Sequence, residues 1–273
     1  METVRHGWQL TDLRFVVDAL VPERRDPDHL IHLLQEDHLL RQAMLEDDRL
    51  FHRLMDEDST LDCVSPLFLF RVLLLRARRD IERELHACIQ RTIEPAALAD
   101  AHRIIAMLAH DDMREYLAWL LATFTQIETE TIQVQIRDGI SRQIRINDLD
   151  IDSLLLYSKV VKPEHRFGIY RRIADACLFL TGVLPEYVEA HRFYPALPEP
   201  RYRLASTALP SLEDLEGYGR TFYRMAAEHP QAQQHDLTKV LSTLSEEFVL
   251  AEKPLAFIAQ RYLTRHRRRL FPI

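Results

Sequence analysis

Apolar residues recur at helical spacing through most of the chain. Between residues 27 and 45 they fall on one face of a helix, at Leu30, Leu33, Leu34, Leu40 and Met44. Steps of three and four residues are typical of an amphipathic helix, which buries one stripe of its surface. The same spacing predicts further helices over 10–21, 47–55, 65–90, 111–125, 164–180, 211–228, 234–248 and 252–269, with others beginning near 94 and 152.

Polar residues placed before prolines mark where several of these helices begin. Asp26-Pro27 and Ser65-Pro66 each put a hydrogen-bond acceptor beside the free amide groups of a first turn, and the proline already has a helical φ. Ser211 is a further predicted cap. Only Arg71 interrupts the apolar run from 67 to 75, so we expect this helix to be buried centrally.

The pattern changes between residues 130 and 147. Ile132, Val134 and Ile136 alternate with polar residues, Asp138-Gly139 follows, and isoleucines resume at 140. Alternation on both sides of Asp-Gly is the usual sequence of a β-hairpin. The sequence therefore predicts one short hairpin at about 130–147.

These elements predict a mainly α fold, a bundle-like globular domain of many helices with that one hairpin. We expect residues 1–273 to form a single compact domain, with a possible division into a helical half (1–128), the hairpin (129–147) and a second helical half (148–273). Five prolines between 185 and 210 predict an extended loop with a short helical turn near its start.

Six glycines in 273 residues exclude several kinds of active site. Gly217-Tyr218-Gly219 begins a dinucleotide-binding pattern, but Phe222 stands where the third glycine is needed. No glycine is followed by lysine, which excludes a P-loop, and Gly139-Ile140-Ser141 lacks the second glycine of a nucleophile elbow. Rossmann, P-loop and α/β-hydrolase functions are therefore excluded.

Cysteine usage and hydropathy point to a soluble, cytoplasmic protein. Cys63, Cys88 and Cys177 are odd in number and have no metal-ligand spacing, as expected in a reducing compartment. Residues 1–25 contain no apolar signal-peptide core, and the longest apolar run is much shorter than the ~20 residues of a membrane span. We expect no membrane association.

Charge is distributed unevenly along the chain. The net charge is −7, which argues against nucleic-acid binding because such binding depends on neutralising phosphates. Residues 1–64 contain 15 acidic and 7 basic side chains, whereas residues 251–273 are strongly basic. We expect the basic C-terminal segment to dock on the acidic N-terminal third, within one chain or across a homodimer.

One part of the chain resembles a known family. The run from Tyr170 to Gly182, the following Val-Leu-Pro-Glu and the later Gly217–Tyr223 segment are similar to a "GD–LF–GFFPE" stretch and a tyrosine-rich helix. That pattern is found in a family of uncharacterised, mostly helical bacterial proteins. Ala174 replaces its glycine, and Val183-Leu184 replaces its aromatic pair. The resemblance implies a helical fold and no particular activity.

The same region supplies candidate residues for binding a ligand or a partner. Asp175 lies one helical turn from Arg171 and close to Arg172, a spacing that also suits a local ion pair. Tyr218 and Tyr223 belong to a group of tyrosines around the proline-rich loop. Aromatic side chains in that position can line a pocket or simply cover the core.

His110-Asp111 suggests a different chemistry. In the helical phosphohydrolases of the HD superfamily, a histidine precedes a His-Asp pair, and these ligands hold a divalent metal that activates water. The order of His86, His110 and Asp111 resembles that pattern, but the Gly and Lys that usually follow the pair are missing. The alternative interpretation is the end of one helix followed by the cap of the next.

Taken together, these features favour a non-enzymatic interaction or regulatory protein, whose partner is a second copy of itself or another protein. This hypothesis requires no cofactor. The alternative is a metal-dependent, HD-like phosphohydrolase with His86, His110 and Asp111 as ligands. A third possibility is a protein that binds a small ligand near Tyr218 and Tyr223.

Overall fold

A computed structural model describes residues 7–23, 25–56, 61–88, 95–126, 129–137, 140–147, 149–193 and 209–271. The chain divides into two compact units. Unit 1 comprises Thr123–Ala256 with Arg268–Ile273, and unit 2 comprises Glu2–Ala122 with Phe257–Arg267. The first boundary lies between Ala122 and Thr123, so the hairpin belongs to unit 1. The later boundaries lie within helices, where helical periodicity gives no sign of them.

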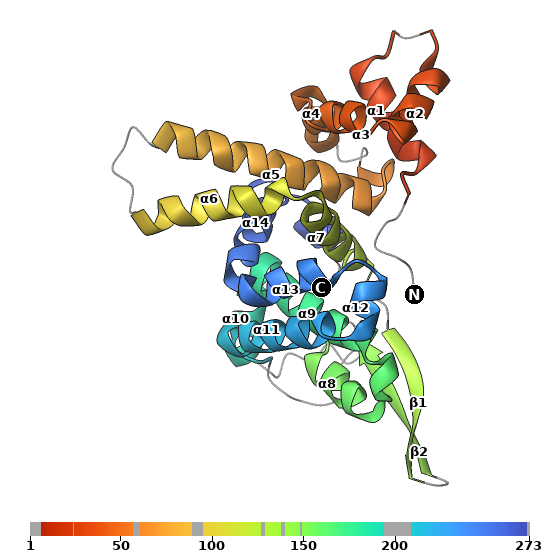
Figure 1. Ribbon diagram of the computed structural model, residues 1–273, viewed down its shortest axis with the longest axis vertical. Coiled ribbons are helices and arrows are strands. Elements are labelled where there is room, and N and C mark those ends of the chain that lie inside the picture. Colours follow the sequence, from red (N-terminus) through yellow and green to blue (C-terminus); the bar gives the residue numbers. More distant parts are fainter. Residues whose placement is uncertain are drawn as a thin grey trace. The chain divides into compact units, whose positions relative to one another are not determined.

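Unit 2 is built from helices, as predicted. They are α1 (Leu10–Leu20), α2 (Pro27–Glu36), α3 (His38–Leu45), α4 (Asp48–Asp56), α5 (Pro66–Cys88), α6 (Pro95–Ala109) and α7 (Asp111–Thr123). The spacing predicts one helix over 27–45, but the structure interrupts it at Asp37. The backbone of Asp37 is extended, and its side chain accepts a hydrogen bond from the Leu40 amide, so it caps α3. α5 and α6 lie side by side (Figure 1).

Unit 1 is also mainly helical. Its helices are α8 (Ile151–Val160), η2 (Pro163–His165), α9 (Phe167–Val183), α10 (Pro185–Phe193), α11 (Leu212–Ala227), α12 (Pro230–Gln234) and α13 (Thr238–Glu246). Two more helices contain residues of both units. They are α14 (Phe248–Arg261) and α15 (Arg267–Leu270). The short helical turn predicted near the start of the proline-rich segment is a longer helix, α10, which extends to Phe193. Residues 194–208 lie outside the described part.

Two strands occupy the segment where the sequence predicts a hairpin. β1 (Thr129–Arg137) pairs antiparallel with β2 (Ile140–Asn147), as Figure 1 shows. The register joins Thr129 to Asn147 and Ile132 to Ile144, and it shifts between Gln135 and Arg137. The Asp-Gly turn itself lies outside the described residues. Strand pairing here adds a small sheet to a unit that is otherwise helical.

The predicted helix starts are confirmed at the positions where a capping side chain precedes the first turn. Asp26 accepts a hydrogen bond from the His29 amide, and Ser65 accepts one from the Phe68 amide. Ser211 forms a capping box with Asp214. Each of these contacts satisfies an amide that has no partner inside its own helix, so local chemistry fixes where these helices begin.

Each unit has its own hydrophobic core. In unit 2, the first half of α5 is buried on all sides, as its continuous apolar run predicts. In unit 1, residues 173–180 of α9 are all buried, and α9 packs mainly on α11. Burying one large apolar side chain contributes about 1.5–3 kcal/mol, so each of these helices adds substantially to the stability of its unit. None of the helices that the structure describes is both long and apolar enough to cross a bilayer.

The buried carboxyl group of Glu252 on α14 gives a pH-dependent prediction for unit 1. Burial raises its pKa, the charge of Glu216 adds to this, and the hydrogen bond with Thr181 opposes it. A raised carboxyl pKa means that ionisation costs more in the folded state than in the unfolded state. Glu252→Gln is therefore expected to be more stable than the wild type at pH 7.

The gain should shrink as the pH falls and vanish below about pH 4, where the carboxyl group is protonated in both states. Thermal unfolding between pH 4 and pH 8 measures this difference. Glu246→Gln, at an exposed position on α13, is the control and should show no such gain. A gain at Glu252 that is equal at all pH values would contradict the assigned cause.

Candidate functional site

Unit 2 contains a cavity of about 410 Å³. It lies among α3, α5 and the first two turns of α7, and Trp8 from the segment before α1 completes its wall. Its volume is within the range of small-molecule pockets, about 300–1,000 Å³. The lining residues are Trp8, His38, Arg41, Gln42, Leu45, Arg71, Leu75, Asp111, Arg114 and Glu115.

Two of the three arginines in the cavity have a carboxylate partner. Arg71 projects from the buried part of α5 and is 6% exposed. Its Nε and Nη2 atoms donate to the two carboxylate oxygens of Glu115 on α7, each at 2.7 Å. Arg114 donates to the Asp111 carboxylate and to the Leu108 carbonyl. The Arg71–Glu115 pair joins α5 to α7, whereas the Arg114–Asp111 pair lies within the first turn of α7.

Arg41 is different, because no carboxylate lies within ion-pair distance of it among the described residues. Its guanidinium donates to the Leu34 and Gln35 carbonyls, at the end of α2. Burial lowers the pKa of Arg41, the positive charge of Arg71 lowers it further, and Glu115 and Asp37 act in the opposite direction. The carboxylates around the cavity therefore do not fully balance its positive charge.

An aromatic ring and apolar side chains form the remaining wall. The guanidinium carbon of Arg71 lies 4.1 Å from the Trp8 ring centre, and that of Arg41 lies 5.0 Å from it. Both distances suit cation–π attraction, which places the ring in the cavity. Leu45 and Leu75 add apolar surface. The cavity thus combines positive charge with an aromatic face and an apolar wall.

A histidine–aspartate pair joins the two sides of the cavity rim. His38 is the first residue of α3, and Asp111 is the first residue of α7. His38 Nε2 lies 3.2 Å from Asp111 Oδ2, and both side chains are about half exposed. The Asp111 carboxylate therefore holds both His38 and Arg114. The contact connects α3 with α7, whose other lining residues are Arg114 and Glu115.

The structure brings together three of the five ligand or partner residues named from the sequence. The Tyr223 hydroxyl donates to Asp175 Oδ1 at 2.8 Å, and Arg171 Nε lies 4.0 Å from Asp175 Oδ2. Asp175 and Tyr223 have no exposed surface, so a ligand could reach them only by displacing core side chains. The contact connects α9 with α11 inside the core of unit 1.

The other two named residues do not take part in this contact. Arg172 donates to Thr123 Oγ1 at 3.1 Å and lies over the Phe124 ring. Tyr218 is 37% exposed on the outer face of α11. Tyr218 and Tyr223 therefore point to different sides of their helix, and the ligand site predicted around both of them is not formed by this pair.

The residues of the phosphohydrolase alternative are not assembled either. His86 is exposed near the end of α5, His110 is exposed between α6 and α7, and Asp111 binds Arg114 and His38. Within the part of the chain that the structure describes, no three His, Cys, Asp or Glu side chains form a group that could hold a metal ion.

Sequence reasoning missed the cavity. Its main residues, Trp8, Arg41, Arg71 and Arg114, are far apart in the chain and meet only through packing. One local sign was present, because Arg71 is the single charge within an otherwise apolar run. A charged residue almost never becomes fully buried without a partner, so that position indicates a buried ion pair.

Comparisons of the chain with protein-family models, with curated proteins and with solved structures found no match.

Proposed function

We propose that the chain is a non-enzymatic, cytoplasmic interaction or regulatory protein, and that the unit 2 cavity binds one acidic group of a partner protein. The observation that carries this proposal is Arg41, a partly buried guanidinium without a carboxylate partner among the described residues. A bound carboxylate would neutralise the local excess of positive charge and accept hydrogen bonds from the arginine. Trp8 offers an aromatic face beside it.

The composition of the cavity supports binding over catalysis. Its lining residues include no serine, threonine, cysteine, lysine or tyrosine, and the acidic groups and histidine that do line it are engaged with one another or with arginines: Glu115 with Arg71, and Asp111 with Arg114 and His38. Trp and Arg are the residue types most enriched where proteins bind one another strongly. The partner is another protein or a second copy of this chain, and sedimentation of the purified chain alone distinguishes these cases.

Binding can be followed by the fluorescence of Trp8 once the other tryptophan is removed by Trp119→Phe. A blocked pentapeptide containing one glutamate among glycines and serines is expected to change Trp8 emission in a saturable way. Arg41→Gln should weaken this binding by roughly tenfold, because the uncompensated charge is lost. Arg14→Gln is the matched control, since Arg14 pairs with Asp28 at an exposed position outside the cavity.

A peptide with glutamine in place of glutamate should bind much more weakly. Equal binding of the two peptides, or of the wild type and Arg41→Gln, would contradict the proposal. Metal-dependent release of phosphate from a phosphoester, lost in His110→Ala, would instead favour the phosphohydrolase alternative. Tighter binding of inorganic phosphate than of the glutamate peptide would assign the cavity to a phosphate group.

A further inference from the structure

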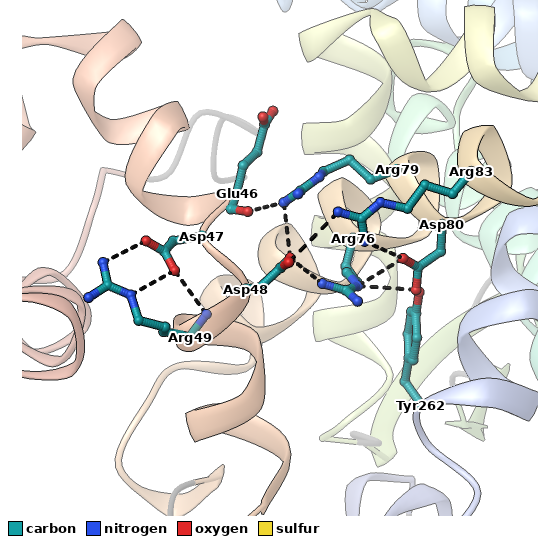
Figure 2. Close-up of polar contacts among 9 residues, drawn as sticks. All are labelled: Glu46, Asp47, Asp48, Arg49, Arg76, Arg79, Asp80, Arg83 and Tyr262. Carbon is teal, nitrogen blue, oxygen red and sulfur yellow. Dashed lines mark hydrogen bonds and ion pairs between the residues drawn. The ribbon is translucent and has the colours of Figure 1, made fainter. Parts of the chain in front are cut away.

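A second polar cluster lies beside the cavity, at the turn between α3 and α4 (Figure 2). Asp48, the first residue of α4, is surrounded by three arginines of α5. Its carboxylate lies 2.5 Å from Arg76, 3.3 Å from Arg79 and 3.7 Å from Arg83. Arg79 and Arg83 follow Arg76 by three and seven residues, so the three arginines form one stripe of the helix. One carboxylate thus serves three guanidinium groups.

The α5 side of this cluster is fixed by buried contacts. Asp80, which is 7% exposed, accepts hydrogen bonds from Arg76 Nε and from the Tyr262 hydroxyl, the latter at 2.7 Å. Burial raises the pKa of Tyr262, and the hydrogen bond with Asp80 raises it further, so the tyrosine stays neutral and donates. Arg76 also lies 4.7 Å from the Phe51 ring centre. The arginine that is closest to Asp48 is therefore also held by Asp80 and by the Phe51 ring.

A chain of hydrogen bonds connects this cluster with the cavity. Arg79 donates to the main-chain carbonyl of Glu46, the residue that ends α3. The Glu46 carboxylate accepts a hydrogen bond from Gln42 Nε2 at 3.0 Å. Gln42 and Leu45 both line the cavity. The C-terminal end of the α3 wall is therefore joined to α5 through Arg79, one of the three arginines that contact Asp48.

We propose that Asp48 is a positioning residue for the cavity, because its contacts with the α5 arginines hold the α3 wall at the distance from α5 that a ligand requires. The inference rests on the proposed function, since it concerns the affinity of that site. Isolated exposed ion pairs contribute little, but here one carboxylate contacts three neighbouring cations, of which Arg76 and Arg83 also pair with Asp80. Its loss leaves less negative charge between these cations beside the end of α3, and removes the ion pair of Arg79. Asp48 is not among the residues that line the cavity.

The test compares two adjacent aspartates. Asp48→Asn removes the charge that the three arginines share, whereas Asp47→Asn removes a charge that pairs with Arg49 on the same turn. The Asp47 carboxylate also accepts a hydrogen bond from the Arg49 amide at the start of α4, and asparagine can accept the same bond, so this capping is preserved. Hydrogen exchange of the α3 amides reports how readily the α3 wall opens. The Trp8 titration with the glutamate peptide reports the affinity of the cavity.

We expect α3 amides to exchange roughly ten times faster in Asp48→Asn, with α6 amides unchanged as the reference for local opening. Peptide affinity should fall by a similar factor. Asp47→Asn should match the wild type in both measurements, and Asp48→Glu should restore most of the protection. Added salt should speed α3 exchange in the wild type but have little effect in Asp48→Asn, because salt screens the contacts that the variant already lacks.

Unchanged α3 exchange in Asp48→Asn would overturn the inference, and so would faster exchange with unchanged affinity. If Asp48→Asn unfolds, Arg83→Gln replaces it. This variant removes the longest of the three contacts and should speed α3 exchange by a smaller factor; no change would again overturn the inference. A further outcome is a wild type that binds no acidic peptide, with α3 amides that still exchange faster in Asp48→Asn than in the wild type. That pair of results would refute the proposed function but support the role of Asp48 in holding α3.

Discussion

Gly219→Ala is expected to lower the free energy of unfolding by about 3 kcal/mol, at the upper end of the usual cost of overfilling a core. Gly219 is buried on α11 against Phe248, the first residue of α14. A Cβ atom at position 219 would lie 2.1 Å from Cε2 and 2.3 Å from Cζ of that ring. Both distances are far below van der Waals contact, so the ring or the helix must move.

The ring has little freedom to move. Phe248 has no exposed surface, and its ring also lies 6.1 Å from the ring of Tyr223. A displacement of Phe248 would therefore be passed to the contact between α9 and α11. Close-packed interiors resist such shifts because few gaps exist to absorb them.

The same helix provides a matched control in Gly217. Gly217 is exposed, and a Cβ atom there would meet nothing within 4 Å. Gly217→Ala should therefore stabilise the protein by about 0.5–1 kcal/mol, the usual gain from replacing glycine inside a helix. Urea unfolding of the two variants should give shifts of opposite sign.

Gly219→Ala combined with Phe248→Leu should cost less than the sum of the single changes, because the smaller side chain leaves room. Equal shifts for the two glycines would show that the clash with Phe248 does not determine the cost.

The parts of the fold that could be predicted are those set by neighbouring residues. Asp26, Ser65 and Ser211 cap helices because a side chain reaches the amides of the next turn, and sequence alone reveals that arrangement. The interruption at Asp37 is of the same kind, although the continuous apolar spacing across it concealed the break.

The helix after residue 185 is longer than the single turn predicted there, for a positional reason. Counting prolines favours a loop, but Pro185 is the first residue of α10, where its missing amide hydrogen costs nothing. The apolar spacing likewise ends the preceding helix at residue 180, whereas α9 continues to Val183. At Gly182 a Cβ atom would lie 3.1 Å from Leu255 Cβ, so the glycine serves a close approach between α9 and α14.

The candidate site could not be predicted, because it depends on how helices are placed and not on where they begin. The spacing of Asp175 and Arg171 indicated their ion pair, which is local. Arg41, Arg71 and Trp8 instead converge across more than sixty residues of sequence, and periodicity gives a buried face but no register between helices. Only the isolated charge of Arg71 within an apolar run pointed toward the cavity.

Tyr223→Phe is expected to lower the free energy of unfolding by about 2 kcal/mol, within the range of ~1–3 kcal/mol for leaving a buried polar group without its donor. The Tyr223 hydroxyl donates to Asp175 at 2.8 Å, and neither side chain has exposed surface. Removing the hydroxyl leaves the carboxylate in the core with one hydrogen bond fewer, while the aromatic ring still fills its space. The cost therefore measures the polar contact and not the packing.

Tyr218→Phe makes the same chemical change on the same helix, at a side chain that is 37% exposed. Its hydroxyl can be replaced by water, so we expect a change of less than about 0.5 kcal/mol. Urea unfolding of both variants gives the comparison directly. In an Asp175→Asn background the cost of Tyr223→Phe should become smaller, because a neutral amide needs the donor less than a carboxylate does. If Tyr218→Phe and Tyr223→Phe cost the same, or if the cost at Tyr223 is unaffected by Asp175→Asn, the hydrogen bond between α9 and α11 does not supply the stability that its burial implies.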